Sequence, residues 1–391
     1  MGAGAAGLAL PPGLSGNAKT AEAAPASAAR PDIPSHLTAY EALYRKEPHA
    51  AALRWFREAR YGMMVCYSLC SLDGIHYFEQ WQYRIPVREY EKKAQRFAAK
   101  GFDAGAIADL AQSAGMKYVT MIAKFCEGFC LWDTKQTAFN TVRTASRRDL
   151  IADMAEACRK RGLGLFFFYE HGFEWHHPHG PRRKDWKSSL VEVPYATPEP
   201  TYAQGDQYDL NKYVDFVFAQ ITELLTQYGP VAGVWLDGWA VPSSGDSSRF
   251  RLPELYAQIR RLQPHALISY KWGITGSEDF LALEASWIDK GLKQAGDVVD
   301  RGATGGRLAK AKQEGTAVEI CDSLLPGWLF RKGVKPQGVN YALKHLELAR
   351  SIKANYLLNI ALLPDGSLNP EEAKTLQTIN EVIRANGLLS Y

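Results

Sequence analysis

The sequence contains no long apolar run and no concentration of charge of one sign. No segment approaches the roughly 18 consecutive apolar residues that a membrane-spanning helix needs. The 391 residues carry a formal net charge of only +4, and their Lys and Arg residues are scattered rather than clustered as in a nucleic-acid-binding protein. We therefore expect neither a membrane nor a nucleic acid as a partner.

Cysteine is also scarce, with six residues in the whole chain. Four of them form two C-x3-C pairs, Cys66/Cys70 and Cys126/Cys130. In an exported protein these pairs could form disulfides, and in a reduced one their thiolates could hold zinc. They could equally be small apolar side chains that fill the fold. The pattern leaves these three interpretations open.

The first 33 residues differ in composition from the rest of the chain. They are rich in Ala, Pro and Ser and contain A-x-A patterns, but they lack the basic segment that begins an export signal. They are either an incomplete export signal, which would place the protein in the periplasm or outside the cell, or a disordered tail. The folded catalytic domain is expected to span residues 34–391.

The most informative segment is a buried apolar strand, 231–237, that ends in a carboxylate followed by glycine. In a parallel α/β barrel the carboxyl ends of the strands form the active-site face. Trp235 and Trp239 flank Asp237, and aromatic rings suit the flat apolar face of a sugar. Asp237 is thus the first candidate catalytic residue, although an Asp that caps a helix or begins a turn would look similar.

Similar strands alternate with amphipathic helices along the chain. Two helices are expected to begin at Asp103 and Asp149 and to end at Gly115 and Gly162. Repeated βα units of this length predict a single (β/α)8-like, TIM-type barrel. The expected strands lie near residues 61–67, 117–123, 163–169, 231–237, 266–270, 317–320 and 356–360.

Several motifs between Trp55 and Tyr391 carry a family resemblance. They are W-F-R-E-A-R-Y-G at 55–62, F-D-A at 102–104, K-F-C-E-G-F-C-L-W at 124–132, R-D-L at 148–150, W-L-D-G at 235–238 and L-L-N-I at 357–360. In this order and spacing the chain resembles the α-L-fucosidase family of retaining glycoside hydrolases, glycoside hydrolase family 29. The resemblance implies a TIM-type barrel, here expected without the C-terminal β-sandwich that is usual in the family.

The resemblance also implies a reaction, a retaining double displacement carried out by two carboxyl groups and no cofactor. Asp237 matches the family's nucleophile. The segment 276–284 is similar to G-D-F-x-T-P-E, which places Glu284 at the acid/base position, with Glu278 in the same loop as the reserve candidate. The expected function is an exo-glycoside hydrolase that acts on an α-L-fucoside or a related sugar.

Several positions that hold the hydroxyls of fucose in the family carry other residues here. The family's H-W-G is Cys66-Tyr67-Ser68, both histidines of its K-H-H-D-G-F are replaced within 124–129, its E-W-Y is Q-W-Q at 80–82, and its N-D-R-W-G arginine is Lys271. Because hydrogen-bonding groups in a closed site select sugars sharply, we expect a changed sugar. The expected substrate-binding residues are Cys66, Tyr67, Trp81, Lys124, Phe125, Cys126, Glu127, Trp132, Glu170, His171, Trp239 and Lys271.

Two other functions stay open from the sequence. A metal-dependent enzyme would recruit Cys66 and Cys126 as ligands, whereas a non-catalytic relative would bind sugar without turnover. The favoured interpretation assigns no metal. It names a carbohydrate substrate as the partner and leaves homo-oligomer formation open.

Overall fold

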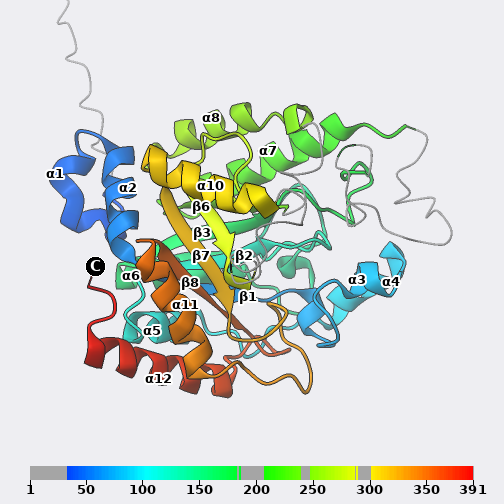
Figure 1. Cartoon of the computed structure of the whole chain (residues 1–391). Helices are drawn as coiled ribbons and strands as arrows, with labels where there is room; N and C mark the ends of the chain where they lie inside the picture. Colours follow the sequence, from blue (N-terminus) through cyan, green and yellow to red (C-terminus); the bar gives the residue numbers. More distant parts are fainter. Residues whose placement is uncertain are drawn as a thin grey trace, which may run out of the picture. The chain divides into compact units, whose positions relative to one another are not determined.

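Strands and helices alternate from residue 33 onward in the computed structural model (Figure 1). The structure describes residues 33–182, 185, 207–238, 247–286, 288 and 301–390, the last range without the side chains of 301–305. The expected N-terminal tail (up to residue 32) and Trp239 lie outside these residues. The strands are β1 Tyr61–Cys66, β2 Tyr118–Lys124, β3 Gly164–Glu170, β4 Gly233–Asp237, β5 Leu267–Tyr270, β6 Phe280–Glu284, β7 Ala317–Ser323 and β8 Asn355–Ala361.

The eight strands form one parallel sheet in the order β5-β4-β3-β2-β1-β8-β7-β6, so that β1 and β8 are neighbours. At the two ends of this order, β5 and β6 approach each other. The Trp272 N–H donates to the Ala282 carbonyl at 3.0 Å, and the Asp279 N–H donates to the Ile268 carbonyl at 2.8 Å. The sheet is therefore a nearly closed barrel, which confirms the TIM-type fold expected from the sequence.

The helices lie outside the strands (Figure 1), and nearly every strand residue is buried, as in sheets covered on both faces. Helix α7 begins earlier than the apolar pattern suggests, because the Asp209 carboxylate accepts a hydrogen bond from the Asn211 N–H and caps it. The helices are α1 Glu41–Tyr44, α2 Pro48–Ala59, α3 Glu79–Gln82, α4 Val87–Glu91, α5 Ala104–Ser113, α6 Leu150–Arg161, α7 Leu210–Gln227, α8 Leu252–Leu262, α10 Arg301–Glu314, α11 Val339–Ser351 and α12 Pro370–Asn386.

One strand lies where a loop was expected. The interpretation of 276–284 as a loop is wrong for its last five residues, because Phe280–Glu284 forms β6 and pairs in parallel with β7. The first four residues of β6 are apolar and buried, so a five-residue apolar run that ends in Glu forms a strand like that of Asp237. Glu284 is consequently the last residue of a barrel strand.

Asp103 caps helix α5 as expected, since its carboxylate accepts a hydrogen bond from the Ala106 N–H at 3.0 Å. Asp103→Ala removes this acceptor and leaves a helix N–H without its partner. We expect the free energy of unfolding to fall by about 1 kcal/mol, measured by urea denaturation, with little change in any activity. An unchanged unfolding midpoint would contradict the capping role.

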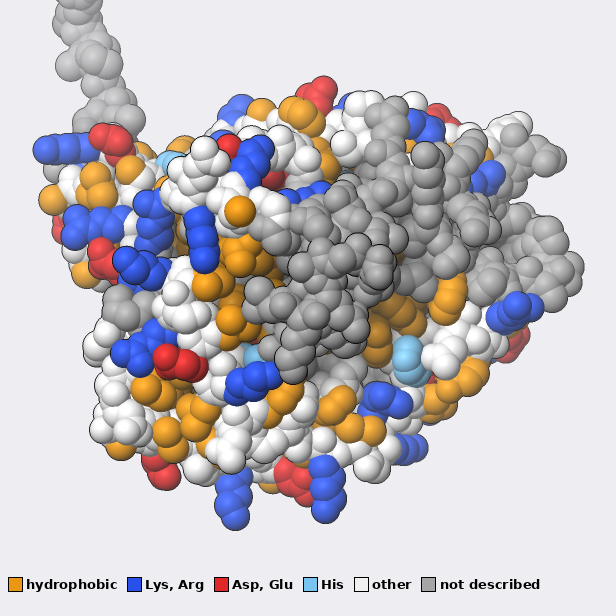
Figure 2. Space-filling model, in the orientation of Figure 1, with side chains coloured by type: hydrophobic (Ala, Val, Ile, Leu, Met, Phe, Trp, Pro, Cys, Tyr) orange, Lys and Arg blue, Asp and Glu red, His pale blue; other side chains and the backbone are white. Residues whose placement is uncertain are grey.

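The distribution of charged side chains on the surface agrees with the scattered Lys and Arg residues of the sequence. Figure 2 shows Lys and Arg side chains of the described residues spread over several elements of this face rather than gathered in one field. Within the described part of the chain, no helix combines the length and apolar character that crossing a membrane requires.

Candidate active site

Chemically reactive side chains gather where the barrel strands end. Asp237, Glu170, Glu284 and Cys66 are the last residues of β4, β3, β6 and β1, and Lys271 directly follows β5. Because all strands are parallel, their carboxyl ends meet at one mouth of the barrel. The topology therefore brings together residues that are far apart in sequence.

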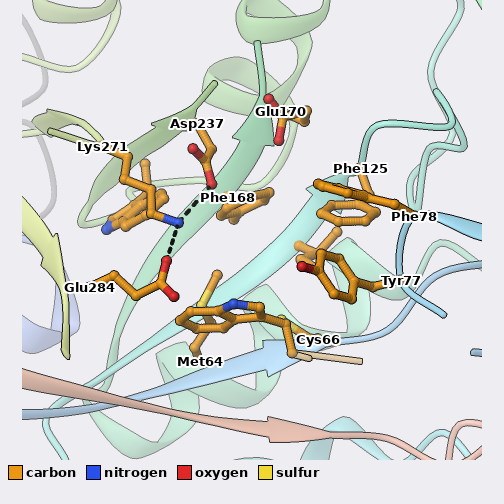
Figure 3. Close-up of a pocket in the computed structure, with 13 residues that line it drawn as sticks. Met64, Cys66, Tyr77, Phe78, Phe125, Phe168, Glu170, Asp237, Lys271 and Glu284 are labelled. Atoms are coloured by element: carbon orange, nitrogen blue, oxygen red, sulfur yellow. Dashed lines mark hydrogen bonds and ion pairs between the residues drawn. The ribbon is translucent and has the colours of Figure 1, made fainter. Parts of the chain in front are cut away.

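These side chains line a cavity of about 140 Å³, far more than the roughly 10–15 Å³ that one water molecule needs in the same measure. Figure 3 shows the carboxyl groups and Lys271 on one side of this space and aromatic rings around the rest. The lining residues are Met64, Cys66, Tyr77, Phe78, Ile122, Phe125, Phe168, Glu170, Trp235, Asp237, Lys271, Glu284 and Trp328. An aromatic wall with a few convergent polar groups is typical of a small-ligand site.

Lys271 bridges two of the carboxylates (Figure 3). Its Nζ lies 3.4 Å from Asp237 Oδ2 and 3.1 Å from Glu284 Oε2. These two oxygens are therefore no more than about 6.5 Å apart, the sum of the two distances. This bound on the two oxygens that face Lys271 is compatible with the separation of about 5–5.5 Å between the carboxyl groups of retaining glycosidases.

Asp237 and Lys271 are buried, and the charges around each of them change its ionisation. Burial raises the pKa of Asp237, while the Lys271 ammonium and the Gly238 N–H oppose that rise. Burial alone would lower the pKa of Lys271, but Asp237 and Glu284 together raise it well above its usual value. Lys271 thus stays protonated and favours the ionised form of Asp237.

The chain around Asp237 leaves no room for a side chain at the next position. The N–H groups of His171 and Gly172 both donate to the Asp237 carbonyl at 2.9 Å, which holds the β3 loop against the end of β4. A Cβ on Gly238 would lie 2.7 Å from both Gly172 Cα and the Tyr270 hydroxyl oxygen, and the φ of Gly238 is +149°. The glycine after Asp237 therefore permits the close approach that fixes this carboxylate at the mouth.

A sequence model of the family described as Alpha-L-fucosidase matches residues 31–388. The chain belongs to the α-L-fucosidase family. Among curated proteins it is similar to alpha-L-fucosidase 1 of Arabidopsis thaliana (25% identical, over 70% of this chain and 50% of the relative) and to tissue alpha-L-fucosidase of Rattus norvegicus (25%, over 86% and 69%). The chain spans about half the length of the plant relatives that it matches.

Solved structures of the α-L-fucosidase family share this barrel. One is alpha-L-fucosidase isoenzyme 1 from Paenibacillus thiaminolyticus (26% identical, TM-score 0.71, covering 87% of this chain and 77% of that one). Another is unliganded alpha-L-fucosidase AlfC from Lactobacillus casei (25% identical, TM-score 0.71, covering 86% and 98%). The likeness extends over most of the described barrel.

Only some of the residues expected to bind substrate line the cavity of this family member. Cys66, Phe125, Glu170 and Lys271 do so. Cys126 lies behind Glu170, where its thiol donates to Glu170 Oε2 at 3.6 Å. The remaining residues expected from the sequence do not line it or lie outside the described residues.

Three of the charged or ionisable residues outside the lining have partners elsewhere in the protein. Lys124 forms a buried ion pair with Glu174. Glu127 accepts a hydrogen bond from the Ser68 hydroxyl, and burial raises the pKa of Glu127 to about 7. The His171 Nδ1 lies 3.1 Å from the Tyr270 hydroxyl, and burial lowers the pKa of His171 to about 3, so the ring is neutral.

Three aromatic residues that were expected to bind substrate lie outside the lining and contact other parts of the protein. The Tyr67 hydroxyl donates to the Pro364 carbonyl at 3.1 Å. The Trp132 indole N–H donates to Glu223 at 3.1 Å. Trp81, in helix α3, packs half-buried against the core. None of these three faces the cavity.

Glu278 lies in the loop before β6 and borders a different hollow, away from Asp237. Its carboxylate accepts hydrogen bonds from the N–H groups of Ile274, Thr275 and Gly276 at 2.8–3.0 Å and from the Tyr256 hydroxyl at 2.9 Å. These bonds hold the loop together. Of the two acid/base candidates, the structure places Glu284 and not Glu278 in the cavity with Asp237.

The cavity also contains residues that sequence reasoning did not identify. A local signal exists for Met64 and Phe168, which lie two positions before an expected site residue on the same strand and so point to the same side. Ile122, on β2, also lines the cavity, as does Trp235, the aromatic neighbour of Asp237 noted in the sequence. Tyr77, Phe78 and Trp328 come from loops, where no periodicity marks them. The Trp328 ring lies 5.4 Å from Lys271 Nζ and covers that ammonium.

All six cysteines are free and buried in the structure. The disulfides considered for the two C-x3-C pairs are therefore not formed, and small thiols in the barrel wall account for the pattern. Within the described residues, no group of three or more His, Cys, Asp or Glu side chains is arranged to hold a metal ion. The described residues around Cys66 and Cys126 therefore do not form the set of ligands that the metal-dependent hypothesis requires.

The burial of the cysteines should make their thiols unreactive in the native protein. Burial raises the pKa of the Cys66 and Cys126 thiols well above the usual value, and the thiolate is the reactive form. We expect the native protein to react little with Ellman's reagent, and all six thiols to react in denaturant without reductant. Fewer than six in denaturant would indicate a disulfide that the structure lacks.

Proposed function

We propose that the chain is a retaining exo-glycoside hydrolase that acts on an α-L-fucoside or a related sugar. The observation that carries this proposal is the pair of carboxylates, Asp237 and Glu284, held in one aromatic cavity by a shared Lys271. Family membership adds support. A variant of the related AlfC enzyme, 26% identical with a TM-score of 0.71, was solved in complex with Fucα(1,6)GlcNAc.

In the first step, an Asp237 carboxylate oxygen attacks the anomeric carbon as the bond from that carbon to the leaving-group oxygen breaks. Glu284 gives its proton to the leaving oxygen. In the second step, Glu284 takes a proton from water, whose oxygen attacks the same carbon and releases Asp237. Lys271 supports the first step, because its ammonium favours the ionised nucleophile against the effect of burial.

The aromatic lining gives the sugar ring an apolar surface, while the polar groups that would select its hydroxyls are few. The family's two histidines are replaced by Phe125 and Cys126, and of these only Phe125 lines the cavity. A site with fewer hydrogen-bonding groups discriminates less sharply between hydroxyl patterns. A fucoside and sugars with the same apolar ring face are therefore both proposed substrates.

The test is the hydrolysis of a panel of 4-nitrophenyl α-L- and β-D-glycosides, the α-L-fucoside included. Release of 4-nitrophenol, with proton NMR of the first sugar product, reports both the substrate and the stereochemistry. We expect turnover of an α-L-glycoside and a first product that keeps the α configuration. No turnover across the panel, or a first product of inverted configuration, would refute it.

A further inference from the structure

Glu170 is a carboxyl group in the cavity that the proposed mechanism does not use. It is the last residue of β3, only 2% exposed, and its strand position pairs in register with that of Asp237. Figure 3 shows both carboxyl groups on the same side of the cavity. Among the residues that the structure describes, Glu170 Oε1 has no hydrogen-bond partner, whereas Oε2 accepts from the Cys126 thiol at 3.6 Å.

Among the described residues, the two lysines whose charges act on Glu170 are already engaged. Lys271 lies between Asp237 and Glu284, and Lys124 is paired with Glu174 behind the lining. A buried carboxylate oxygen without a donor is unfavourable, because burial removes its hydration without replacing it. Because Glu170 lines the cavity, its carboxyl group, which has one unpartnered oxygen, is suited to a donor supplied by the ligand.

The position of Glu170 restricts which donor that is. Neighbouring strands lie about 4.8 Å apart, so the Glu170 carboxyl stands beside the nucleophile and close to the anomeric carbon that Asp237 attacks. That carbon has two ring neighbours, the ring oxygen and C2. The ring oxygen carries no hydrogen to donate, whereas C2 carries a hydroxyl.

We infer that Glu170 binds the 2-hydroxyl of the sugar and acts as a specificity-determining residue, an inference that rests on the proposed glycosidase function. Neither the family assignment nor the motifs assign this contact. The substrate class is thereby narrowed to glycosides with a free hydroxyl at C2 on the side that faces β3.

The contact is expected to strengthen as the reaction proceeds. Burial, and then the charge of Asp237, raise the pKa of Glu170 well above the usual value. When Asp237 bonds to the anomeric carbon it loses its negative charge, which removes this repulsion while positive charge develops on the sugar. Hydrogen bonds to the 2-hydroxyl that strengthen in the transition state raise the rate and not only the affinity.

The experiment is a two-by-two comparison of wild type and Glu170→Gln on 4-nitrophenyl α-L-fucopyranoside and on its 2-deoxy counterpart. We expect Glu170→Gln to lower kcat/KM on the fucoside by roughly 10- to 100-fold and on the 2-deoxy substrate by less than about 3-fold. Comparing the variant with wild type on each substrate cancels the different intrinsic reactivity of the two glycosides. A similar loss on both substrates, or no loss on either, overturns the inference.

Glu372→Gln is the matched control. Glu372 is also a buried glutamate with an unpartnered Oε1, but it does not line the cavity. We expect wild-type kcat/KM on both substrates. A substrate-selective loss at Glu372 as large as that at Glu170 would overturn the inference, because the selectivity would then not report contact with the sugar.

Two further measurements separate this inference from the proposed function. Calorimetry of L-fucose and 2-deoxy-L-fucose binding to wild type needs neither turnover nor a folded variant. Weaker binding of the 2-deoxy sugar supports the inference even if no glycoside is hydrolysed, whereas equal affinities, or no binding of either sugar, overturn it. Conversely, hydrolysis that depends on Asp237 but is indifferent to the 2-hydroxyl would refute the role of Glu170 and leave the glycosidase proposal standing.

Discussion

Asp237→Ala is expected to reduce kcat on the best substrate of the panel by about 10³- to 10⁶-fold, the scale on which removal of a covalent nucleophile acts. The substitution removes the only atom proposed to bond to the anomeric carbon, while the aromatic walls that hold the sugar stay in place. KM should therefore change much less than kcat. The measurement is 4-nitrophenol release at saturating substrate, with thermal unfolding to confirm that the variant is folded.

Chemical rescue distinguishes a nucleophile from a residue that merely supports the site. Alanine leaves space beside Lys271, and azide can enter it and attack the anomeric carbon as 4-nitrophenolate leaves. From an α-glycoside this gives a glycosyl azide of the β configuration, which NMR identifies. The matched control is Asp103→Ala, the helix-capping variant, which should be less stable yet fully active. An Asp237→Ala variant that retains a tenth of wild-type kcat would exclude Asp237 as the nucleophile.

The position of Asp237 can be predicted from sequence because its signal is local. A buried run that ends in Asp-Gly marks a strand and the group at its end within a few consecutive residues. The same logic applies to Glu284, yet β6 was not expected, because its five residues are a short apolar run within a segment that resembles a loop motif of the family. Five residues are too few to show a periodic pattern. The segment 280–284 is recognised as a strand only because it pairs with β7 and helps to close the barrel.

The relations between the site residues are not local and could not be predicted. That Lys271 bridges Asp237 and Glu284 depends on where three different strands end around the barrel mouth. That Glu170 stands beside Asp237 depends on the register of β3 against β4. A strand register is set by side-chain packing and pairing across the whole sheet, and no motif in either strand encodes it.

The position of a residue at the end of a strand also does not show whether its side chain faces the cavity. Lys124 is the last residue of β2, but the pairing of β2 with β3 shifts between Ile122 and Lys124, and the Lys124 side chain is paired behind the lining. Trp328 reaches the cavity from the loop after β7, with a φ of +69°. An irregularity within a strand and a loop conformation therefore each change the membership of the site.

Glu284→Ala is the second substitution with a large expected effect, and the size of that effect should depend on the leaving group. A general acid contributes about 10²- to 10⁴-fold, but 4-nitrophenolate is stable enough to leave with little protonation. We therefore expect a loss near the lower end for formation of the glycosyl-enzyme from the 4-nitrophenyl glycoside. A glycoside with a sugar or alkyl leaving group should lose activity near the upper end. The measurement is kcat/KM for both kinds of substrate.

The comparison with Glu278 decides between the two carboxylates proposed from the motif. Glu278→Gln keeps a side-chain oxygen for the loop N–H groups of Ile274 and Thr275 and lies outside the cavity, so kcat/KM should stay near wild type for every leaving group.

Azide should accelerate Glu284→Ala by attacking the glycosyl-enzyme, giving an azide of the α configuration, opposite to the product from Asp237→Ala. Leaving-group dependence at Glu278 instead of Glu284 would mean that the loop before β6 moves into the cavity when substrate binds. The acid would then come from a residue that the structure places at a different hollow.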